Sequence, residues 1–319
     1  MKCIDETVTS KWAIYNGDAV DVLAGIPDAS VHYSIFSPPF ASLYTYSNSP
    51  RDLGNCKSDD EFFEHFSHVI YQLRRVMRPG RNVSFHCMLM PTSKERDGYI
   101  GLKDFRGDLI RAFQAQGFIY ASEVCIWKDP VTQMQRTKAL GLLHKTVRGN
   151  AAMSRQGLAD YLVTMRAPGE DDTRIVHYRD DNECVDACET QGLDYADQAN
   201  SIYPVELWQK IASPIWTDIN PSDTLQYRSA REHDDERHIC PLQLEVIRRG
   251  IQLWTNPGEV VLTPFCGIGS EVYSAVQLGR FGIGVELKGS YYDQSVKNLH
   301  SLVTQRNLFD DTEILSELS

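Results

Sequence analysis

The sequence predicts an α/β protein with one doubly wound, mainly parallel sheet, and three observations lead to this prediction. Short apolar runs rich in β-branched and aromatic residues alternate with longer amphipathic segments. The segment between successive strands is long enough for a helical crossover, which parallel strands need. Two of the strands run directly into turns rich in glycine or proline, and ligands bind at this place in such sheets.

The elements of the first half follow from helix caps and strand patterns. Ser58 can cap the first long helix, acidic residues fill its first turn, and Arg78-Pro79-Gly80 stops it. Gly117 stops the second helix in the same way. The expected strands are Trp12–Asn16, Val31–Phe36, Asn82–Leu89 and Phe118–Trp127, and the expected helices are Asp60–Met77 and Phe105–Gln116.

The second half repeats the alternation after a long polar middle. Strands that alternate with helices at this spacing place helices on both faces of the sheet. The expected elements are the helix Leu242–Thr255, the strand Glu259–Phe265, the helix Ser270–Leu278, the strand Phe281–Glu286 and the helix Tyr291–Val303.

The composition fits a soluble globular protein rather than a secreted or membrane protein. The 319 residues are 42% hydrophobic and 24% charged, and no run of 18 apolar residues occurs. The first residues contain no apolar signal-peptide core. The eight cysteines lack the spacing of a disulfide scaffold, which a chain of this length does not need. We therefore expect reduced thiols, no membrane partner and a cytoplasmic location.

The net charge of −11 argues against a protein that coats nucleic acid through its overall charge, but the charge is unevenly distributed. Between Lys128 and Pro168 there are seven Lys or Arg residues and two acids, and nearby amides and hydroxyls can reach base edges. A solvated basic face is the alternative interpretation. The next stretch, 169–200, holds ten acids and is interpreted as a solvated insertion. The candidate DNA-binding residues are Lys128, Arg136, Lys138, Lys145, Arg148 and Arg155.

The turn Thr263–Ser270 follows an apolar strand and has features of a nucleotide-binding loop. Gly267 and Gly269 let the backbone approach a ligand closely, and the helix that follows offers free N–H groups. The turn is not the dinucleotide fingerprint, because the third glycine of that motif would fall at Val272. Glu286 ends the next strand, where a carboxylate can accept hydrogen bonds from a ribose diol. The pattern favours an adenosine site, with a structural turn as the alternative.

A second turn, Ser37-Pro38-Pro39-Phe40, directly follows the strand Val31–Phe36. Its two prolines fix the backbone and remove two N–H donors, which leaves carbonyl groups to accept hydrogen bonds. A hydroxyl and a carbonyl can together accept both hydrogens of an exocyclic amine while Phe40 stacks on the ring. The turn therefore predicts a site for an aromatic amine, and a rigid exit from the strand is the alternative.

These two turns resemble those of amino-directed DNA methyltransferases, which methylate adenine N6 or cytosine N4 with S-adenosylmethionine. Ser37–Phe40 matches the family's catalytic tetrapeptide (D/N/S)-P-P-(Y/F/W), and Thr263–Ser270 is similar to its cofactor loop D-P-F-x-G-S-G-T, with Thr and Ile in place of the usual Asp and Ser. The order, catalytic motif first, resembles the beta class. The resemblance implies the catalytic residues Ser37, Pro38, Pro39 and Phe40, and the cofactor-binding residues Asp18, His238, Cys240, Pro241, Thr263, Phe265, Cys266, Gly267, Gly269, Ser270 and Glu286.

The resemblance covers about residues 12–128 and 237–303 and implies a Rossmann-like fold of S-adenosylmethionine-dependent methyltransferases. Residues 1–128 and 237–319 would form the catalytic and cofactor-binding domain, and 129–236 an inserted target-recognition region. Trp127 ends the strand before this region and is either a wall of the base pocket or a core residue.

The implied function is site-specific methyl transfer to the N4 amine of cytosine in duplex DNA, with the target base flipped out of the helix. Within the family Ser at the first tetrapeptide position usually accompanies cytosine N4, and adenine N6 is the alternative. Three competing hypotheses are a decayed protein that binds DNA or cofactor without turnover, a glutamine methyltransferase, and a metal module at Cys184 and Cys188 with His177. The expected partners are duplex DNA, a cognate restriction endonuclease and a second copy of the chain. The protein is expected to act in a bacterium, encoded either by the bacterium or by its phage. No metal is expected.

Overall fold

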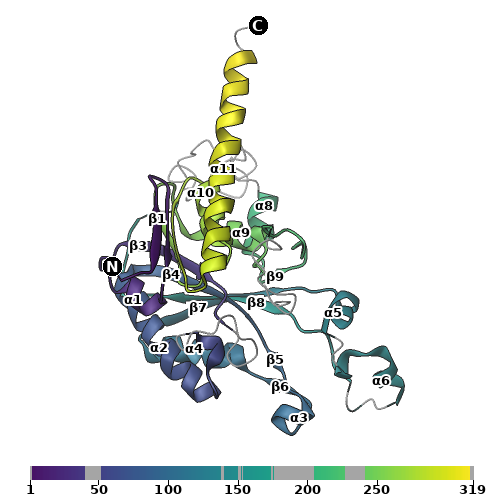
Figure 1. Ribbon diagram of the computed structural model, residues 1–319. Helices are drawn as coiled ribbons and strands as arrows, with labels where there is room; N and C mark the ends of the chain where they lie inside the picture. Colours follow the sequence, from purple (N-terminus) through teal and green to yellow (C-terminus); the bar gives the residue numbers. More distant parts are fainter. Residues whose placement is uncertain are drawn as a thin grey trace.

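The described residues of the protein fold around a nine-stranded mixed sheet in the computed structural model (Figure 1). The structure describes residues 2–39, 52–137, 140–149, 152, 154–173, 175, 205–226 and 241–316. Within these residues the strand order is β1-β2-β11-β10-β3-β4-β8-β7-β9, and β5 and β6 form a separate hairpin. The strands are β1 (Asp5–Val8), β2 (Trp12–Asn16), β3 (Val31–Phe36), β4 (Met77–Met88), β5 (Met90–Pro91), β6 (Leu102–Lys103), β7 (Ile119–Ile126), β8 (Asp160–Arg166), β9 (Ile215–Trp216), β10 (Val260–Thr263) and β11 (Phe281–Glu286).

The central strands of the sheet are parallel. From β2 through β11, β10 and β3 to β4, each strand pairs parallel with its neighbours, while β1 and β8 join this block antiparallel. The winding reverses between β10 and β3, because the chain moves outward from β3 to β4 on one side and from β10 to β11 on the other. The predicted doubly wound, mainly parallel sheet is therefore confirmed. Such a reversal opens a crevice beyond the carboxyl ends of the two strands.

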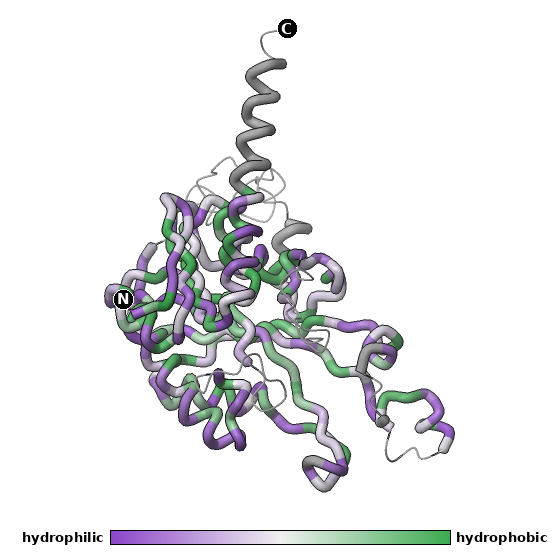
Figure 2. Tube along the Cα trace, in the orientation of Figure 1, coloured by the Kyte–Doolittle hydropathy of each residue, from purple (hydrophilic) through white to green (hydrophobic). Residues whose placement is uncertain are grey.

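Helices cover both faces of the sheet (Figure 1). On one face α2 contacts α1 and α4, and on the other α10 contacts α9 and α11. Phe113 of α4 stacks on Phe85 of β4 in the first layer, and Ile35 and Ile247 belong to the core of the second. Figure 2 shows α2 and α4 alternating between green and purple, as amphipathic helices do. The helices are α1 (Ala19–Leu23), α2 (Asp59–Val76), α3 (Lys94–Asp97), α4 (Phe105–Ala115), α5 (Pro130–Thr137), α6 (His144–Gly149), α8 (Val205–Ala212), α9 (Leu244–Trp254), α10 (Ser270–Gln277) and α11 (Gly289–Ser316).

Most predicted elements agree with the structure to within a few residues. Ser58 caps α2 as expected, because its Oγ accepts a hydrogen bond from the Glu61 amide. Arg78-Pro79-Gly80 does not end α2 as expected, because α2 ends at Val76 and these three residues lie inside β4, which begins at Met77. Gly80 has a φ of +73° and its N–H donates to Ala167 O, which joins this segment to the residue after β8. The sequence patterns do not predict β1 or β8.

Part of the segment 129–236, which the resemblance assigns to target recognition, pairs within the main sheet. β8 lies between β4 and β7, and β9 extends the edge beyond β7. Two other segments extend away from the sheet in Figure 1, namely the β5–β6 hairpin with α3 and the arm formed by α5 and α6. The division into a catalytic domain and a target-recognition region stays a prediction.

Among the residues that the structure describes, none of the helices combines the length and the apolar content that crossing a membrane requires. In the same part of the chain no three His, Cys, Asp or Glu side chains gather as metal ligands. His177, Cys184 and Cys188, considered above as a metal module, lie outside the described residues.

Candidate active site

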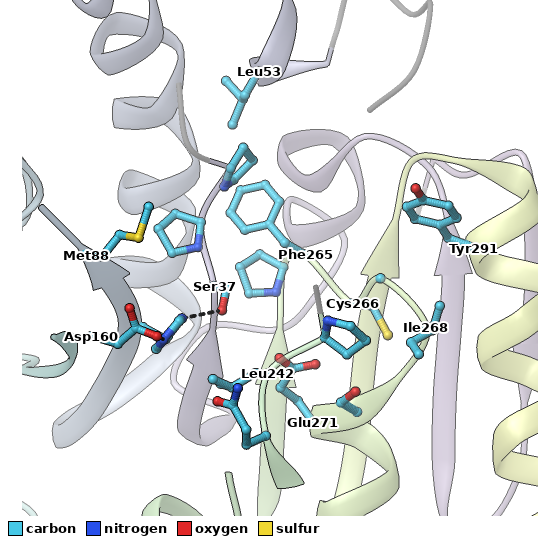
Figure 3. A pocket seen from close by; sticks show the side chains of 18 of the residues that line it. Ser37, Leu53, Met88, Asp160, Leu242, Phe265, Cys266, Ile268, Glu271 and Tyr291 are labelled. Atoms are coloured by element: carbon cyan, nitrogen blue, oxygen red, sulfur yellow. Dashed lines mark hydrogen bonds and ion pairs between the residues drawn. The ribbon is translucent and has the colours of Figure 1, made fainter. Parts of the chain in front are cut away.

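A cavity of about 790 Å³ opens at the carboxyl ends of the central strands (Figure 3). The parallel pairing of β3 and β10 places Ser34 opposite Leu262, so the turns after these strands leave the sheet at the same edge. The two predicted motifs therefore line one cavity. The sequence-predicted residues that line it are Asp18, Ser37, Pro38, Pro39, Lys128, Arg155, Pro241, Phe265, Cys266, Gly267, Ser270 and Glu286.

Ser37 begins a chain of hydrogen bonds that crosses three strands. Its Oγ lies 3.1 Å from Nδ1 of His86 on β4, and Nε2 of His86 lies 3.0 Å from Oδ2 of Asp160 on β8 (Figure 3). Nζ of Lys128 lies 2.5 Å from the same oxygen of Asp160. An ionised carboxylate only accepts hydrogen bonds, so Nε2 of His86 donates, and a neutral ring then accepts at Nδ1 from the Ser37 hydroxyl. The lone pairs that remain on Ser37 Oγ can accept hydrogen bonds from a ligand.

Asp160 fixes the orientation of this chain of hydrogen bonds. It is 3% exposed, and burial by itself would raise the pKa of its carboxyl. The contacts of Asp160 with His86 and Lys128 outweigh burial and hold the pKa of its carboxyl group below its usual range. A buried carboxylate with two donors is fixed in position, so Asp160 orients the His86 ring and, through it, the Ser37 hydroxyl.

Sequence reasoning missed His86 and Asp160 as site residues. A polar side chain within an apolar strand costs free energy unless it has a partner, and this mismatch is the signal that could have found His86 in the expected strand Asn82–Leu89. Lys128 was predicted to contact DNA, and the structure pairs it with Asp160 at the cavity wall. Trp127 beside it also lines the cavity and is 51% exposed, so it is not a core residue.

The loop after β10 is held in place by Glu286 at the end of β11. Its Oε2 accepts a hydrogen bond from the Gly267 amide at 2.7 Å, and its Oε1 accepts one from the Lys288 amide at 2.9 Å. Gly269 has a φ of +92°, and a Cβ there would lie 3.1 Å from Cβ of Ser295, so the loop requires glycine at this position. Burial raises the pKa of Glu286 to about 7 although both amides favour its charged form. Glu286 therefore links the end of β11 to the loop after β10, and both border the cavity.

Asp18 follows β2 and borders the same side of the cavity. Its Oδ1 accepts hydrogen bonds from the amides of Val20 at 2.9 Å and Asp21 at 3.2 Å, which caps α1. The cap fixes the Asp18 carboxylate beside the ends of β2 and β11, which are themselves paired in parallel.

Ser270 and Glu271 are the first two residues of α10, and both bring a polar side chain to the cavity. Glu271 is 5% exposed and lines the cavity, yet among the described residues no other residue donates a hydrogen bond to its carboxyl group. Burial raises its pKa to about 8, and the nearby charge of Glu286 adds to this shift. The Ser270 hydroxyl is buried and has no partner either within the described chain. Buried polar groups without partners are rare, so their presence at a cavity points to a ligand.

The remaining predicted residues lie elsewhere or cannot be placed. Thr263, 1% exposed, and Gly269 support the loop without lining the cavity. Lys145 and Arg148 are exposed on α6, and Arg136 lies in α5. Phe40, Lys138, His238 and Cys240 lie outside the described residues, so their roles stay predictions.

The sequence of this chain is similar to known DNA methylases along most of its length. A family model described as DNA methylase matches residues 31–297, which include both turns. The type II methyltransferase M.BglII of Bacillus subtilis is 24% identical over 306 residues, or 95% of this chain and 73% of that protein. The type II methyltransferase M.BamHI of Bacillus amyloliquefaciens is 22% identical over 277 residues, or 86% of this chain and 54% of that protein.

Solved structures show the same fold. TTHA0409 of Thermus thermophilus, solved in complex with S-adenosyl-L-methionine, superposes with a TM-score of 0.62 at 20% identity, over 91% of this chain and 93% of that one. The cytosine-N4-specific PvuII DNA methyltransferase superposes with a TM-score of 0.60 at 16% identity, over 91% of this chain and 87% of that one. The predicted Rossmann-like fold is therefore confirmed.

Replacing Glu271 with Gln tests the effect of this buried acid on stability. Above its ordinary pKa of 4.5, Glu271 ionises in the unfolded state but stays protonated in the folded state up to about pH 8, so the wild-type protein loses stability as the pH rises. The free energy of unfolding of Glu271→Gln should equal that of the wild type at pH 4, below the ordinary pKa of the carboxyl group. At pH 8 it should exceed the wild-type value by a few kcal/mol, at about 1.4 kcal/mol per pKa unit.

Urea unfolding of both proteins at pH 4 and pH 8 measures this difference. Glu64→Gln, at an exposed position of α2, is the matched control and should change stability equally little at both pH values. A difference between Glu271→Gln and the wild type that does not depend on pH would contradict the raised pKa.

Proposed function

Since the chain belongs to the DNA methylase family that it matches over residues 31–297, we propose that it transfers a methyl group from S-adenosylmethionine to the N4 amine of cytosine at a specific site in duplex DNA. The observation that carries this proposal is the shared cavity, in which the Ser37-Pro38-Pro39 turn and the glycine loop after β10 lie together. One motif supplies acceptors for an amine and the other supplies a nucleotide site, so the cavity can hold both reactants of a methyl transfer.

The residues of the cavity fit S-adenosylmethionine. The volume of about 790 Å³ lies within the usual range for small-ligand sites. The carboxylate of Glu286 can accept hydrogen bonds from ribose hydroxyls, and the unpartnered Ser270 hydroxyl and the loop amides offer further contacts. When bound, S-adenosylmethionine supplies a methyl group on a positively charged sulfur. The chain's residues that would hold it are Asp18, Pro241, Phe265, Cys266, Gly267, Ser270 and Glu286, with Thr263 and Gly269 shaping the loop.

Ser37 and Pro38 act on the amine of the target base. The Ser37 hydroxyl donates to His86, so its oxygen accepts one N–H of the amine, and the Pro38 carbonyl accepts the other. Both hydrogen bonds favour a pyramidal nitrogen, whose lone pair is less delocalised into the ring and is a better nucleophile. The amine must also lose a proton when its nitrogen gains the methyl group. Ser37 Oγ takes this proton and passes its own to Nδ1 of His86, and Asp160 stabilises the resulting imidazolium.

Cytosine N4 is the preferred target because Ser37 is neutral. Cytosine N3, beside the amine, is an acceptor that a carboxylate at this position would repel. Adenine N1 is an acceptor as well, so the preference also depends on the family pattern for serine and on the likeness to the cytosine-N4-specific PvuII enzyme. We further propose that the base leaves the duplex to reach Ser37, with Phe40 and Trp127 beside it.

The basic residues of the arm formed by α5 and α6 are proposed to bind DNA phosphates. Lys145 and Arg148 are exposed on α6, while Arg155 lies at the cavity wall, near the base to be methylated. Residues 129–236 would recognise the target sequence. The type II relatives support a restriction-modification role in a bacterial cytoplasm, with a cognate endonuclease and a second copy of the chain as further proposed partners.

The identity of the methylated base tests the proposed function directly. Incubating the protein with tritiated S-adenosylmethionine and mixed-sequence duplex DNA, followed by digestion to nucleosides, should place the label in N4-methylcytosine. Label in N6-methyladenine would keep the reaction class and overturn the choice of base. Absence of label, with cofactor binding shown separately, would support a decayed protein.

Substitutions of Ser37 and His86 test the proton path. Ser37→Ala should lower kcat by about 10²-fold or more, because a preorganised polar group is lost, and should leave cofactor affinity unchanged. His86→Asn should lower kcat by about tenfold or more without raising KM for DNA, because it cannot accept the proton. His300→Asn, at an exposed position of α11 outside the cavity lining, is the control. If His86→Asn raises KM and leaves kcat unchanged, His86 does not take part in the proton transfer.

Substitutions on α6 test the DNA-binding arm. The double variant Lys145→Ala, Arg148→Ala should weaken DNA binding at physiological salt. The plot of the logarithm of the DNA-binding constant against the logarithm of the salt concentration should have a smaller slope, by the amount expected for the loss of about two phosphate contacts. kcat at saturating DNA should stay unchanged, because neither residue lines the cavity. Lys11→Ala with Arg111→Ala, two exposed positions elsewhere, is the matched control. An unaltered salt dependence would remove α6 from the DNA interface.

A further inference from the structure

We propose that Glu271 is the counter-ion for the positive charge on the methionine-derived arm of the methyl donor. This inference rests on the proposed function, because it assigns a binding role within the same cavity. Glu271 belongs to neither of the two sequence motifs: it follows Ser270, the last residue of the loop, as the second residue of α10. Its role is therefore visible only in the structure.

Among the described residues of the cavity, Glu271 is the carboxyl group that no other residue contacts by a hydrogen bond or an ion pair. Asp160 is paired with His86 and Lys128, and Glu286 accepts hydrogen bonds from two backbone amides. Asp18, Asp52 and Asp129 each accept from the backbone of a neighbouring turn or helix. For Glu271, within the same part of the chain, the one hydrogen bond is with its own amide.

The position of Glu271 places its carboxyl group inside the cavity rather than in the core. The residue is 5% exposed and contributes to the lining. Figure 3 shows its side chain reaching from α10 toward the space between Ser37 and Cys266. The unpartnered hydroxyl of Ser270 lies on the preceding residue. A ligand that extends from the glycine loop toward Ser37 therefore passes this carboxyl group.

No cation of the described chain neutralises Glu271. Its pKa is shifted by burial, by its own amide and by Glu286, and no described Lys or Arg contributes. The groups that face it from adjacent elements are Glu286 of β11 and the Cys266 thiol of the loop, and neither supplies a positive charge. Arg249 of α9 is already paired with acids of its own region, and the ammonium of Lys288 lies over the Tyr291 ring. The charge that would complete the site must come from the ligand.

S-adenosylmethionine carries two positive charges on this arm, the sulfonium and the α-ammonium. A desolvated carboxylate gains most from a cation that is buried with it, because the local dielectric is low. Without such a cation Glu271 holds a proton at neutral pH, since burial raises its pKa to about 8. Binding of the cationic arm lowers that pKa, so the proton leaves Oε of Glu271 for solvent as the ion pair forms. Binding therefore releases a proton, and affinity rises with pH below about 8.

Calorimetry with the full chain tests this inference. S-adenosylmethionine, S-adenosylhomocysteine and 5′-methylthioadenosine are titrated into wild type, Glu271→Gln and Glu64→Gln at pH 7, in two buffers that differ in ionisation enthalpy. Glu271→Gln should bind S-adenosylmethionine about tenfold or more weakly, as expected for loss of a charge-assisted contact. It should bind 5′-methylthioadenosine, which lacks both charges, as the wild type does. The proton released by the wild type should be absent in Glu271→Gln and present in Glu64→Gln.

The three ligands separate the two sources of charge. Weaker binding of S-adenosylhomocysteine as well as S-adenosylmethionine by Glu271→Gln identifies the ammonium as the partner, and weaker binding of S-adenosylmethionine alone identifies the sulfonium. Unchanged binding of 5′-methylthioadenosine also demonstrates that the variant site is folded.

Two results would overturn the inference while leaving the proposed function intact. One is equal affinity of wild type and Glu271→Gln for S-adenosylmethionine, and the other is an equal loss of affinity for 5′-methylthioadenosine. Failure of the wild type to bind S-adenosylmethionine at all is a different result, because it would overturn the proposed function together with this inference.

Discussion

The parallel hydrogen bonding of β10 to β3 is the constraint on which the site depends. Parallel neighbours end at the same edge, so the glycine loop after β10 and the Ser37 turn after β3 open into one crevice although more than 200 residues separate them. β11 pairs parallel with β10, and β2 pairs parallel with β11, so Glu286 and Asp18 reach the same edge. A shift of the β10–β3 pairing would move the amine site away from the nucleotide site. Each turn alone binds only one of the two proposed reactants, so methyl transfer would then be prevented.

Charges in the cavity are arranged in two ways that serve different purposes. Asp160 is paired with His86 and Lys128, so it stays ionised and holds the Ser37 hydroxyl in one orientation. Glu271 accepts no hydrogen bond from any other described residue, and it stays protonated until a cation reaches it. The first arrangement needs rigidity before substrate arrives, because an acceptor must be oriented to activate an amine. The buried Glu271 carboxyl group lowers the stability of the ligand-free protein, and binding of a cationic ligand stabilises the folded state again.

The sequence predicted the parallel sheet, the bounds of several strands and both ligand-binding turns, because these depend on local patterns. Apolar periodicity and the Ser58 cap each involve residues that are close together in the sequence, so the sequence alone reveals them. The order of the two turns along the chain is likewise part of the sequence. It did not reveal β8 or the pairing of His86 with Asp160. β8 follows the basic segment without a pattern that ties it to β4, and the two side chains are 74 residues apart. Contacts of this kind arise from strand pairing, which a single sequence does not encode locally.

The sequence by itself determined which chemistry the chain can carry: a hydroxyl and prolines after one strand, a glycine loop after another and an acid at the end of a third. Only the tertiary structure decided which groups are charged and which way the Ser37 hydroxyl points. Antiparallel pairing of β4 with β8 buries Asp160 beside His86, and α10 buries Glu271 away from every cation of the described chain. The physical reason is that residue identity fixes the ionisable group, whereas burial and neighbours in space fix its protonation state.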